Sequence, residues 1–374
     1  MIPKYLFIDD ETGSVTKALL DGFNDKKLVN ISPLTLSKDE PFEKVCNRIK
    51  EEFAAHQYDG VLIDLCLDGT GANSLAFKAQ PFAQQIRTWA TEGKMPQFPV
   101  VLCSTIGNYD VYRKDSASHD LFDYYFDKTD VNYEHESICM KSLAEGYQLL
   151  NKKDIKVEEY LGRKDIYEID DQVIDYLRGP STFDIARRIL KDVMPYPGLL
   201  IDKHTVAARM GINMDESNGW PKLKEAIYTQ AEYQGVFSAG WKRCWSDKVN
   251  AFFMSLSEGK PYQILSAEER VAILERAGFE GLVPAKPIEL NNSSYYNTVC
   301  SYSGLPLDSM EGIPVEDRMS LMPWQENHYV SFYFVAKGDF KEERLCQEGL
   351  KKKLEITHRL QDEQAKGEWK QGVL

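Results

Sequence analysis

The sequence predicts an α/β fold, in which a doubly wound five-stranded parallel sheet occupies residues 1–150 and a mainly helical α+β region follows. Two observations support this prediction. Short runs that are apolar on both faces, as strands covered by helices are, alternate with segments of helical spacing. Most of these runs also end abruptly in charged or hydroxyl residues.

The predicted strands and helices of this part follow one another in a regular order. Strands are expected at residues 5–8, 28–31, 58–64, 98–103 and 121–126. Helices are expected at 15–23, 42–55, 77–92 and 135–150, with a short helical segment between the last two strands. Strands that alternate with helices predict parallel pairing, and in open α/β sheets ligands bind beyond the carboxyl ends of the strands.

Polar side chains stand at four of these strand ends. They are Asp9 and Asp10, Asp64, Ser104 or Thr105, and Lys128. Taken alone, Asp9 and Asp10 also fit a charged loop that caps the next helix. Three carboxylates brought close together repel one another by about 4 kcal/mol per pair at an effective dielectric constant of about 20, so they need protonation or a cation. Mg²⁺ suits such a set because it takes one or two carboxylates and keeps water molecules for an incoming phosphate.

Four short motifs at the strand ends resemble the receiver domain of bacterial two-component response regulators. They are residues 7–11 (FIDDE), 60–65 (GVLIDL), 99–104 (PVVLCS) and 124–128 (YYFDK). Each motif alone is weak, but all four follow in the right order. The resemblance covers residues 1–150 and implies a cytoplasmic signalling domain, phosphorylated on an aspartate by a histidine kinase or a phosphotransfer protein.

The resemblance implies that Asp64 is the phosphoacceptor, and a carboxylate can indeed act as the nucleophile that accepts a phosphoryl group. It also implies the ligands of the Mg²⁺ cofactor. Asp10 would bind the ion directly, Asp9 would bind it through water, and Cys66 would offer its backbone carbonyl.

Three further residues match the part of the family's site that responds to phosphate. Ser104 matches the hydroxyl that senses it, Lys128 the lysine that pairs with it, and Tyr125 the aromatic residue that turns inward on activation. Tyr125 alone is equally typical of an ordinary aromatic residue on a strand. Phosphorylation would add about −1.5 to −2 charges beside Lys128 and Ser104, and would bias the C-terminal region or a homodimer contact.

The sequence departs from the family's pattern at several positions. Thr129 stands where proline usually follows the lysine, and residues 67–71 (LDGTG) replace the usual Met-Pro after the phosphoacceptor. Thr105 stands where the family keeps a very small residue. A receiver-like scaffold that is never phosphorylated is therefore a second interpretation. A metal-dependent phosphohydrolase is a third, although Asp9 and Asp10 follow each other directly, whereas the matching carboxylates of that class straddle one residue.

The rest of the chain carries no catalytic or metal-ligand motif, and we expect an effector region without a predicted enzymatic activity. Residues 151–280 are predicted to be mainly helical, and residues 281–374 to form a strand and a long C-terminal helix. The individual signals are a helix at 167–177, a helix capped by Ser181 or Thr182, a capping box at 266–269, a strand at 330–335 and a charged helix at 340–366.

A DNA-binding module is an alternative for part of this region. Residues 202–212 and 220–232 fit two helices of a helix-turn-helix, with a wing at 236–245 and with Lys242 and Arg243 as DNA or partner contacts. However, residues 200–250 contain seven Lys or Arg and six Asp or Glu, and DNA binding needs several cationic contacts to phosphate. We therefore favour a packing helix that ends at a glycine.

The aromatic residues Trp241, Trp245, Phe252 and Phe253 form a second cluster of the same region. They could stack on bases or bind a partner, but core packing is the favoured interpretation.

Composition limits the remaining classes of function. A formal net charge of −13 argues against a broad nucleic-acid or membrane-binding surface. No apolar stretch is long enough to span a membrane, and the N-terminal residues do not resemble a signal peptide. The seven cysteines are scattered and contain no Cys-x-x-Cys pair, which is typical of reduced thiols in a cytoplasmic protein.

Overall fold

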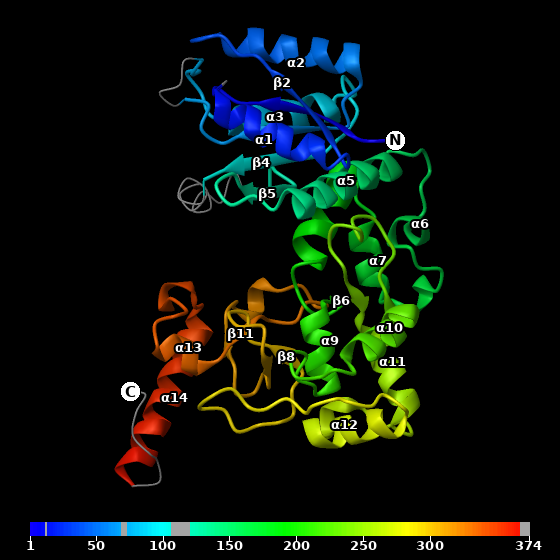
Figure 1. Cartoon of the computed structure of the whole chain (residues 1–374), viewed down its shortest axis with the longest axis vertical. Helices are drawn as coiled ribbons and strands as arrows, with labels where there is room; N and C mark the ends of the chain where they lie inside the picture. Colours follow the sequence, from blue (N-terminus) through cyan, green and yellow to red (C-terminus); the bar gives the residue numbers. More distant parts are fainter. Residues whose placement is uncertain (12, 69–72, 106–119, 367–374) are drawn as a thin grey trace. The chain divides into compact units, whose positions relative to one another are not determined.

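A computed structural model of the chain describes residues 1–374 except 12, 69–72, 106–119 and 367–374 (Figure 1). The chain divides into two compact units. The first unit consists of Met1–Lys191 and Gln234–Trp241, and the second unit consists of Asp192–Tyr233 and Lys242–Leu374. No helix among the described residues is long and apolar enough to cross a membrane.

The first unit is built on the predicted five-stranded parallel sheet. Its strands are β1 (Lys4–Ile8), β2 (Asn30–Leu34), β3 (Gly60–Asp64), β4 (Val100–Ser104) and β5 (Tyr124–Asp127), in the order β2-β1-β3-β4-β5. Every pairing is parallel, so the carboxyl ends of all five strands lie along one edge. The sheet confirms the α/β prediction for this part of the chain.

Helices cover the sheet, and they agree with the predicted ones to within a few residues. They are α1 (Ser14–Asp25), α2 (Phe42–His56), α3 (Ala79–Thr91) and α5 (Tyr133–Leu150). The segment between β4 and β5, where a short helix was expected, falls mostly outside the described residues. Side chains that alternate along β1 are buried on both faces of the sheet. On one face, Leu6 and Ile8 pack in a core with residues of α2 and α3. On the other face, the hydroxyl of Tyr5 donates to the carbonyl of Met140 in α5 at 2.6 Å.

A buried polar network joins three elements of the sheet and its helices. The carboxylate of Asp123, just before β5, accepts a hydrogen bond from Arg87 of α3 at 2.7 Å and another from the hydroxyl of Tyr147 of α5 at 2.6 Å. The same carboxylate accepts from the backbone N–H of Val100 at 2.7 Å. Because Arg87 is only 7% exposed, its charge depends on Asp123 for compensation.

The first unit continues past residue 150 with short helices. They are α6 (Val157–Leu161), η2 (Ile166–Glu168), α7 (Asp171–Leu177), α8 (Thr182–Arg187) and η3 (Arg188–Val193), the last of which runs into the second unit. Ser181 is the predicted cap of α8, and its side chain accepts from the N–H of Asp184. The predicted helix at 167–177 is divided, because Asp170 caps a new helix by accepting from the N–H of Gln172. Residues 234–241 return to this unit, where the N–H of Val236 donates to the carbonyl of Tyr160 at 2.7 Å.

The second unit combines helices with short two-stranded sheets. Its helical elements are α9 (Lys203–Met210), α10 (Trp220–Ala231), α11 (Ser246–Leu256), η4 (Tyr262–Ile264), α12 (Ala267–Arg276), η5 (Arg318–Ser320), α13 (Phe332–Ala336), η6 (Glu342–Arg344) and α14 (Gln347–Ala365). Its strands are β6 (Leu200–Ile201), β7 (Cys244–Trp245), β8 (Thr298–Val299), β9 (Pro306–Leu307), β10 (Ile313–Pro314) and β11 (Tyr329–Val330). The described part of the second unit is thus helical with little strand.

Helix α9 ends at a glycine, as we expected. Gly211 adopts a φ of 76°, and a Cβ atom there would lie 2.8 Å from the Cα of Ala267. The predicted capping box before α12 is also present, since the side chains of Ser266 and Glu269 each accept from the other's backbone N–H. The wing of the helix-turn-helix alternative is not formed, because residues 234–241 pack in the first unit and β7 pairs with β6.

The predicted strand at 330–335 is wrong. Only Tyr329–Val330 is a strand, and α13 begins directly after Ser331, whose side chain accepts from the N–H of Tyr333. Aromatic and β-branched residues favour strands in general, but here a serine cap and the spacing of the buried Phe332 and Val335 fit one helical face. The long C-terminal helix is confirmed, although α14 starts only at Gln347.

Candidate metal centre

The topology of the sheet explains why carboxylates from distant parts of the sequence meet. Strands β1 and β3 are neighbours, with Ile8 paired to Ile63. The residues that follow these positions are Asp9 and Asp10 after β1 and Asp64 at the end of β3. All three therefore lie at the same edge, at the point where the strand order changes direction, which is where ligands bind in doubly wound sheets.

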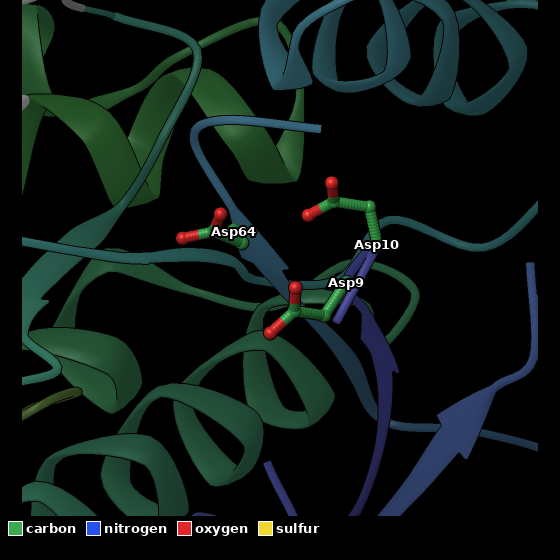
Figure 2. Close-up of side chains that lie close together, drawn as sticks. All are labelled: Asp9, Asp10 and Asp64. Carbon is green, nitrogen blue, oxygen red and sulfur yellow. The ribbon is translucent and has the colours of Figure 1, made fainter. Parts of the chain in front are cut away.

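The three carboxylates form a compact and buried cluster, shown in Figure 2. One carboxylate oxygen of each residue can be chosen so that all three lie within 4.8 Å of one another. Asp9 is 5% exposed, and Asp10 and Asp64 are each 2% exposed. This is the one group of potential metal ligands found among the described residues.

Burial and mutual repulsion make these carboxylates unusually weak acids. Burial raises the pKa of Asp9 to about 7, and the negative charges of Asp64 and Asp10 add to this effect. Burial also raises the pKa of Asp10, with the charges of Asp64 and Glu11 contributing. The pKa of Asp64 is raised by burial as well, although the positive charge of Lys128 opposes the shift.

Lys128 lies directly beside the cluster. Its Nζ atom is 3.1 Å from Oδ1 of Asp64, and its backbone N–H donates to the carbonyl of Ser104 at 3.0 Å. Burial lowers the pKa of Lys128, but the charges of Asp64 and Asp9 outweigh it and raise the pKa overall. One lysine cannot neutralise three ionised carboxylates, so the site retains negative charge that a cation could balance.

Three buried side-chain atoms at this edge have no hydrogen-bond partner within the described structure. They are Oδ2 of Asp10, Oγ of Ser104 and Oδ1 of Asp64, the last of which has only its ion pair with Lys128. Leaving a buried polar atom unpaired costs roughly 1–3 kcal/mol, and such atoms in a native structure suggest an ion or ligand. The donors are all oxygens, which suits a hard cation such as Mg²⁺ or Ca²⁺. The residues present therefore fit a divalent cation.

The remaining predicted residues of the first unit lie beside the cluster. The backbone N–H of Cys66 donates to Oδ2 of Asp64 at 3.2 Å. The hydroxyl of Tyr125, which is half-buried, donates to the carbonyl of Ser104 at 3.4 Å. Asp68 is exposed, and the rest of its unusual loop, residues 69–71, falls outside the described residues.

Glu11 was not singled out from the sequence, although it belongs to the same run of carboxylates. Its backbone N–H donates to Oδ1 of Asp9 at 2.9 Å, which helps to fix that side chain. Its negative charge contributes to the raised pKa values of Asp10 and Asp64. The signal that could have identified Glu11 is its position immediately after the pair, at the edge where charges accumulate.

Lys242 and Arg243 belong to the second unit and are engaged there. Lys242 pairs with Glu232 at 3.0 Å, and Nε of Arg243 donates to the carbonyl of Met194 at 3.1 Å.

The aromatic cluster is core at three of its four positions. Trp245, Phe252 and Phe253 are at most 5% exposed, as predicted, whereas Trp241 is half-buried.

No protein-family model matches the chain, and no curated protein matches it.

Proposed function

We propose that the first unit is a response-regulator-like receiver domain, which binds Mg²⁺ and accepts a phosphoryl group on Asp64 to control the effector region of the chain. The observation that supports this most is the composition of one sheet edge. Three buried carboxylates, the amine of Lys128 at 3.1 Å and an unpaired Ser104 hydroxyl meet there. They offer a cation site, a nucleophile and two donors for phosphoryl oxygens.

In the proposed reaction a carboxylate oxygen of Asp64 forms a bond to phosphorus while the bond from phosphorus to the donor's leaving group breaks. The leaving group departs with that electron pair. Lys128, now paired with Asp64, would donate to a phosphoryl oxygen, and the hydroxyl of Ser104 would donate to another. A histidine kinase or a phosphotransfer protein in the cytoplasm would supply the phosphoryl group.

Asp9, Asp10, Asp64 and the backbone carbonyl of Cys66 would hold the Mg²⁺ ion. When bound, it supplies the positive charge that offsets the repulsion between the carboxylates and an incoming phosphate. Tyr125 would report the modification, because its hydroxyl already contacts the backbone of Ser104.

The test is the intact mass of the full-length protein after incubation with Mg²⁺ and a small phosphodonor such as acetyl phosphate. We expect one phosphoryl adduct on the wild-type chain and none on Asp64→Asn. The matched control is Asp68→Asn, which removes an exposed carboxylate nearby and should still be phosphorylated. A wild-type chain that binds Mg²⁺ but gains no adduct would indicate the scaffold instead. Continuous release of phosphate from an ester, lost in Asp64→Asn, would indicate a phosphohydrolase.

A further inference from the structure

The second unit contains a cavity of about 460 Å³ that has no part in the function proposed above. Its walls come from β8, from Ser309 after β9, from β10 and β11, from η5 with residues 321–327, and from the first turn of α14. Cavities of this volume hold small organic ligands. Its lining is mixed, with charged and hydroxyl side chains beside Leu321 and Met322.

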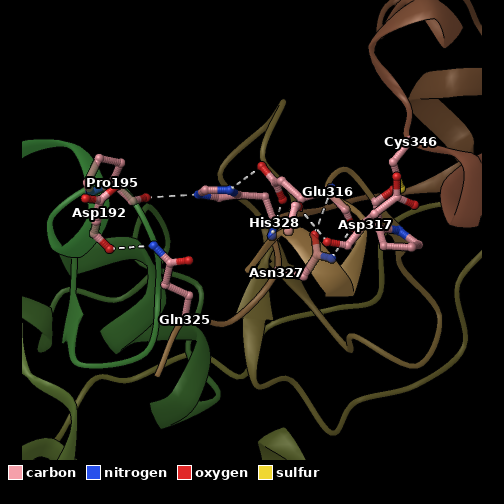
Figure 3. Close-up of polar contacts among 10 residues, drawn as sticks. Asp192, Pro195, Glu316, Asp317, Gln325, Asn327, His328 and Cys346 are labelled. Atoms are coloured by element: carbon pink, nitrogen blue, oxygen red, sulfur yellow. Dashed lines mark hydrogen bonds and ion pairs between the residues drawn. The ribbon is translucent and has the colours of Figure 1, made fainter. Parts of the chain in front are cut away.

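Residues 321–327 form the longest part of the wall and are held in place by the end of η3 and the segment that follows it (Figure 3). The side-chain amide of Gln325 donates to the carbonyl of Asp192 at 2.6 Å. The backbone N–H of Glu326 donates to the carbonyl of Pro197 at 2.7 Å. Because the wall is fixed before a ligand arrives, little conformational entropy is lost on binding.

His328 holds the end of this wall. Figure 3 shows its ring between two acceptors: Nδ1 lies 2.9 Å from Oε1 of Glu316, and Nε2 lies 3.0 Å from the carbonyl of Pro195. A neutral imidazole carries one N–H, whereas the imidazolium ion carries two, so this geometry favours the protonated form. The other groups facing the ring are the aromatic ring of Tyr196 and the more distant charge of Asp202.

A buried arginine fixes one carboxylate of the cavity. Both oxygens of Glu326 accept from Nη2 of Arg209, at 2.9 and 2.8 Å, and Arg209 is only 2% exposed. Nη1 of Arg209 donates to Oγ of Ser246 at 2.6 Å, which orients the guanidinium group. Glu326 is therefore held at a set position, with most of its charge offset by the arginine behind it.

The other charged and hydroxyl groups of the cavity are less fully engaged. Arg318 is exposed and has no ion pair within the described parts of the chain. The carboxylate of Glu348, in the first turn of α14, accepts one hydrogen bond within the described parts of the chain, from the backbone N–H of Arg318 at 3.4 Å. Thr298 lines the cavity although it is only 3% exposed overall. The cavity thus offers a ligand one cationic side chain without an ion pair, one carboxylate and one hydroxyl-bearing residue.

We propose that this cavity binds a small zwitterion, an α-amino acid or a comparable amino carboxylate. The ligand's carboxylate pairs with Arg318 and the hydroxyl of Thr298, and its ammonium group pairs with Glu348. A simple anion would pair with Arg318 but leave the charge of Glu348 unpaired, and a simple cation would pair with Glu348 but leave Arg318 unpaired. Two opposite charges on one small molecule satisfy both, and the cavity has room for a side chain beside Leu321 and Met322.

The test is calorimetric titration of the full-length protein with the common amino acids, each at millimolar concentration. At least one should bind, and its single-charge analogues, the matching carboxylic acid and the matching amine, should bind at least about tenfold more weakly, as the loss of one hydrogen-bonded charge predicts. Arg318→Gln and Glu348→Gln should each weaken binding by about tenfold or more for the same reason. Both residues are exposed, so neither change should alter folding, which the melting temperature checks.

Two exposed positions of the same unit provide matched controls. Arg276→Gln, on α12, and Glu355→Gln, on α14, make the same chemical changes at residues that do not line the cavity. Both control variants should bind like the wild type. The proposal is wrong if no amino acid gives a binding signal, or if Arg318→Gln and Glu348→Gln bind as tightly as the controls.

Discussion

The carboxylate cluster should make the metal-free protein less stable than it would be with one carboxylate fewer. The three carboxylate oxygens lie within 4.8 Å of one another, and at that upper limit each ionised pair repels by about 3 kcal/mol at an effective dielectric constant of about 20. Asp10→Asn removes two of the three pairs and also replaces a buried charge by a neutral amide of similar shape. Two pairs correspond to about 6 kcal/mol, of which the nearby positive charge of Lys128 offsets a part. We therefore expect this variant to raise the unfolding free energy of the first unit by roughly 3 kcal/mol in the absence of metal, at about pH 8, where Asp9 is ionised.

The gain should depend on pH in a defined direction. Because burial raises the pKa of Asp9 from its ordinary value of 3.8 to about 7, the folded state binds more protons than the unfolded state between these values. Wild-type stability then falls as the pH rises through this window, by about 4 kcal/mol for a shift of this size. Asp10→Asn should flatten the fall, and its advantage should shrink at about pH 5.

Mg²⁺ should reverse the effect in the wild type alone. A cation at one hundred times its dissociation constant stabilises the folded state by about 2.7 kcal/mol, and Asp10→Asn should lose most of this gain. Scanning calorimetry of the full chain, with and without Mg²⁺ at both pH values, measures all these quantities. Asp25→Asn, which changes an exposed aspartate of α1, is the control. If Asp10→Asn is no more stable than the wild type without metal, or gains as much from Mg²⁺, the reasoning fails.

Three further predictions concern the two units separately, and calorimetry tests each of them. Asp123→Asn should destabilise the first unit by roughly 3–5 kcal/mol, because it leaves the charge of Arg87 buried and uncompensated; a smaller loss than about 1 kcal/mol would mean that the guanidinium finds other compensation. Gly211→Ala should lower the unfolding free energy of the second unit by about 1–2 kcal/mol or more, because the φ of Gly211 is 76° and an added Cβ would lie 2.8 Å from the Cα of Ala267. An unchanged melting temperature would contradict this prediction. Burial lowers the pKa of His328, but the hydrogen bond and the charge of Glu316 outweigh it and raise the pKa overall. The stability that His328 contributes is therefore present below its unfolded pKa of about 6.5 and is lost as the pH rises through the folded value. His328→Gln should remove this pH dependence of stability, and a variant with the same pH profile as the wild type would refute the prediction.

Local pattern was enough to predict the sheet of the first unit and the residues at its carboxyl edge. Runs such as residues 5–8 are apolar on both faces only in a covered parallel sheet, and parallel pairing places the ends of β1 and β3 together. The periodicity of the strands is therefore sufficient to predict that Asp10 and Asp64, 54 positions apart in the sequence, lie close together.

Other features depend on contacts that no local pattern encodes. Arg209 and Glu326 are 117 residues apart, and neither stands in a motif, yet their pairing fixes a wall of the cavity. The return of residues 234–241 to the first unit is of the same kind, because it includes a backbone hydrogen bond from Val236 to Tyr160, 76 positions earlier in the sequence. At residues 330–335 a local pattern was present but ambiguous, and the cap formed by Ser331 decided for a helix.

The central claim is that Asp64 accepts a phosphoryl group, and the position of the adduct tests it most directly. Borohydride reduces an aspartyl phosphate to homoserine, which peptide mass spectrometry assigns to a single residue. After incubation with Mg²⁺ and acetyl phosphate, we expect homoserine at position 64 and at no other aspartate. A chain without homoserine at position 64, or with the adduct on Asp9 or Asp10 instead, would contradict the account.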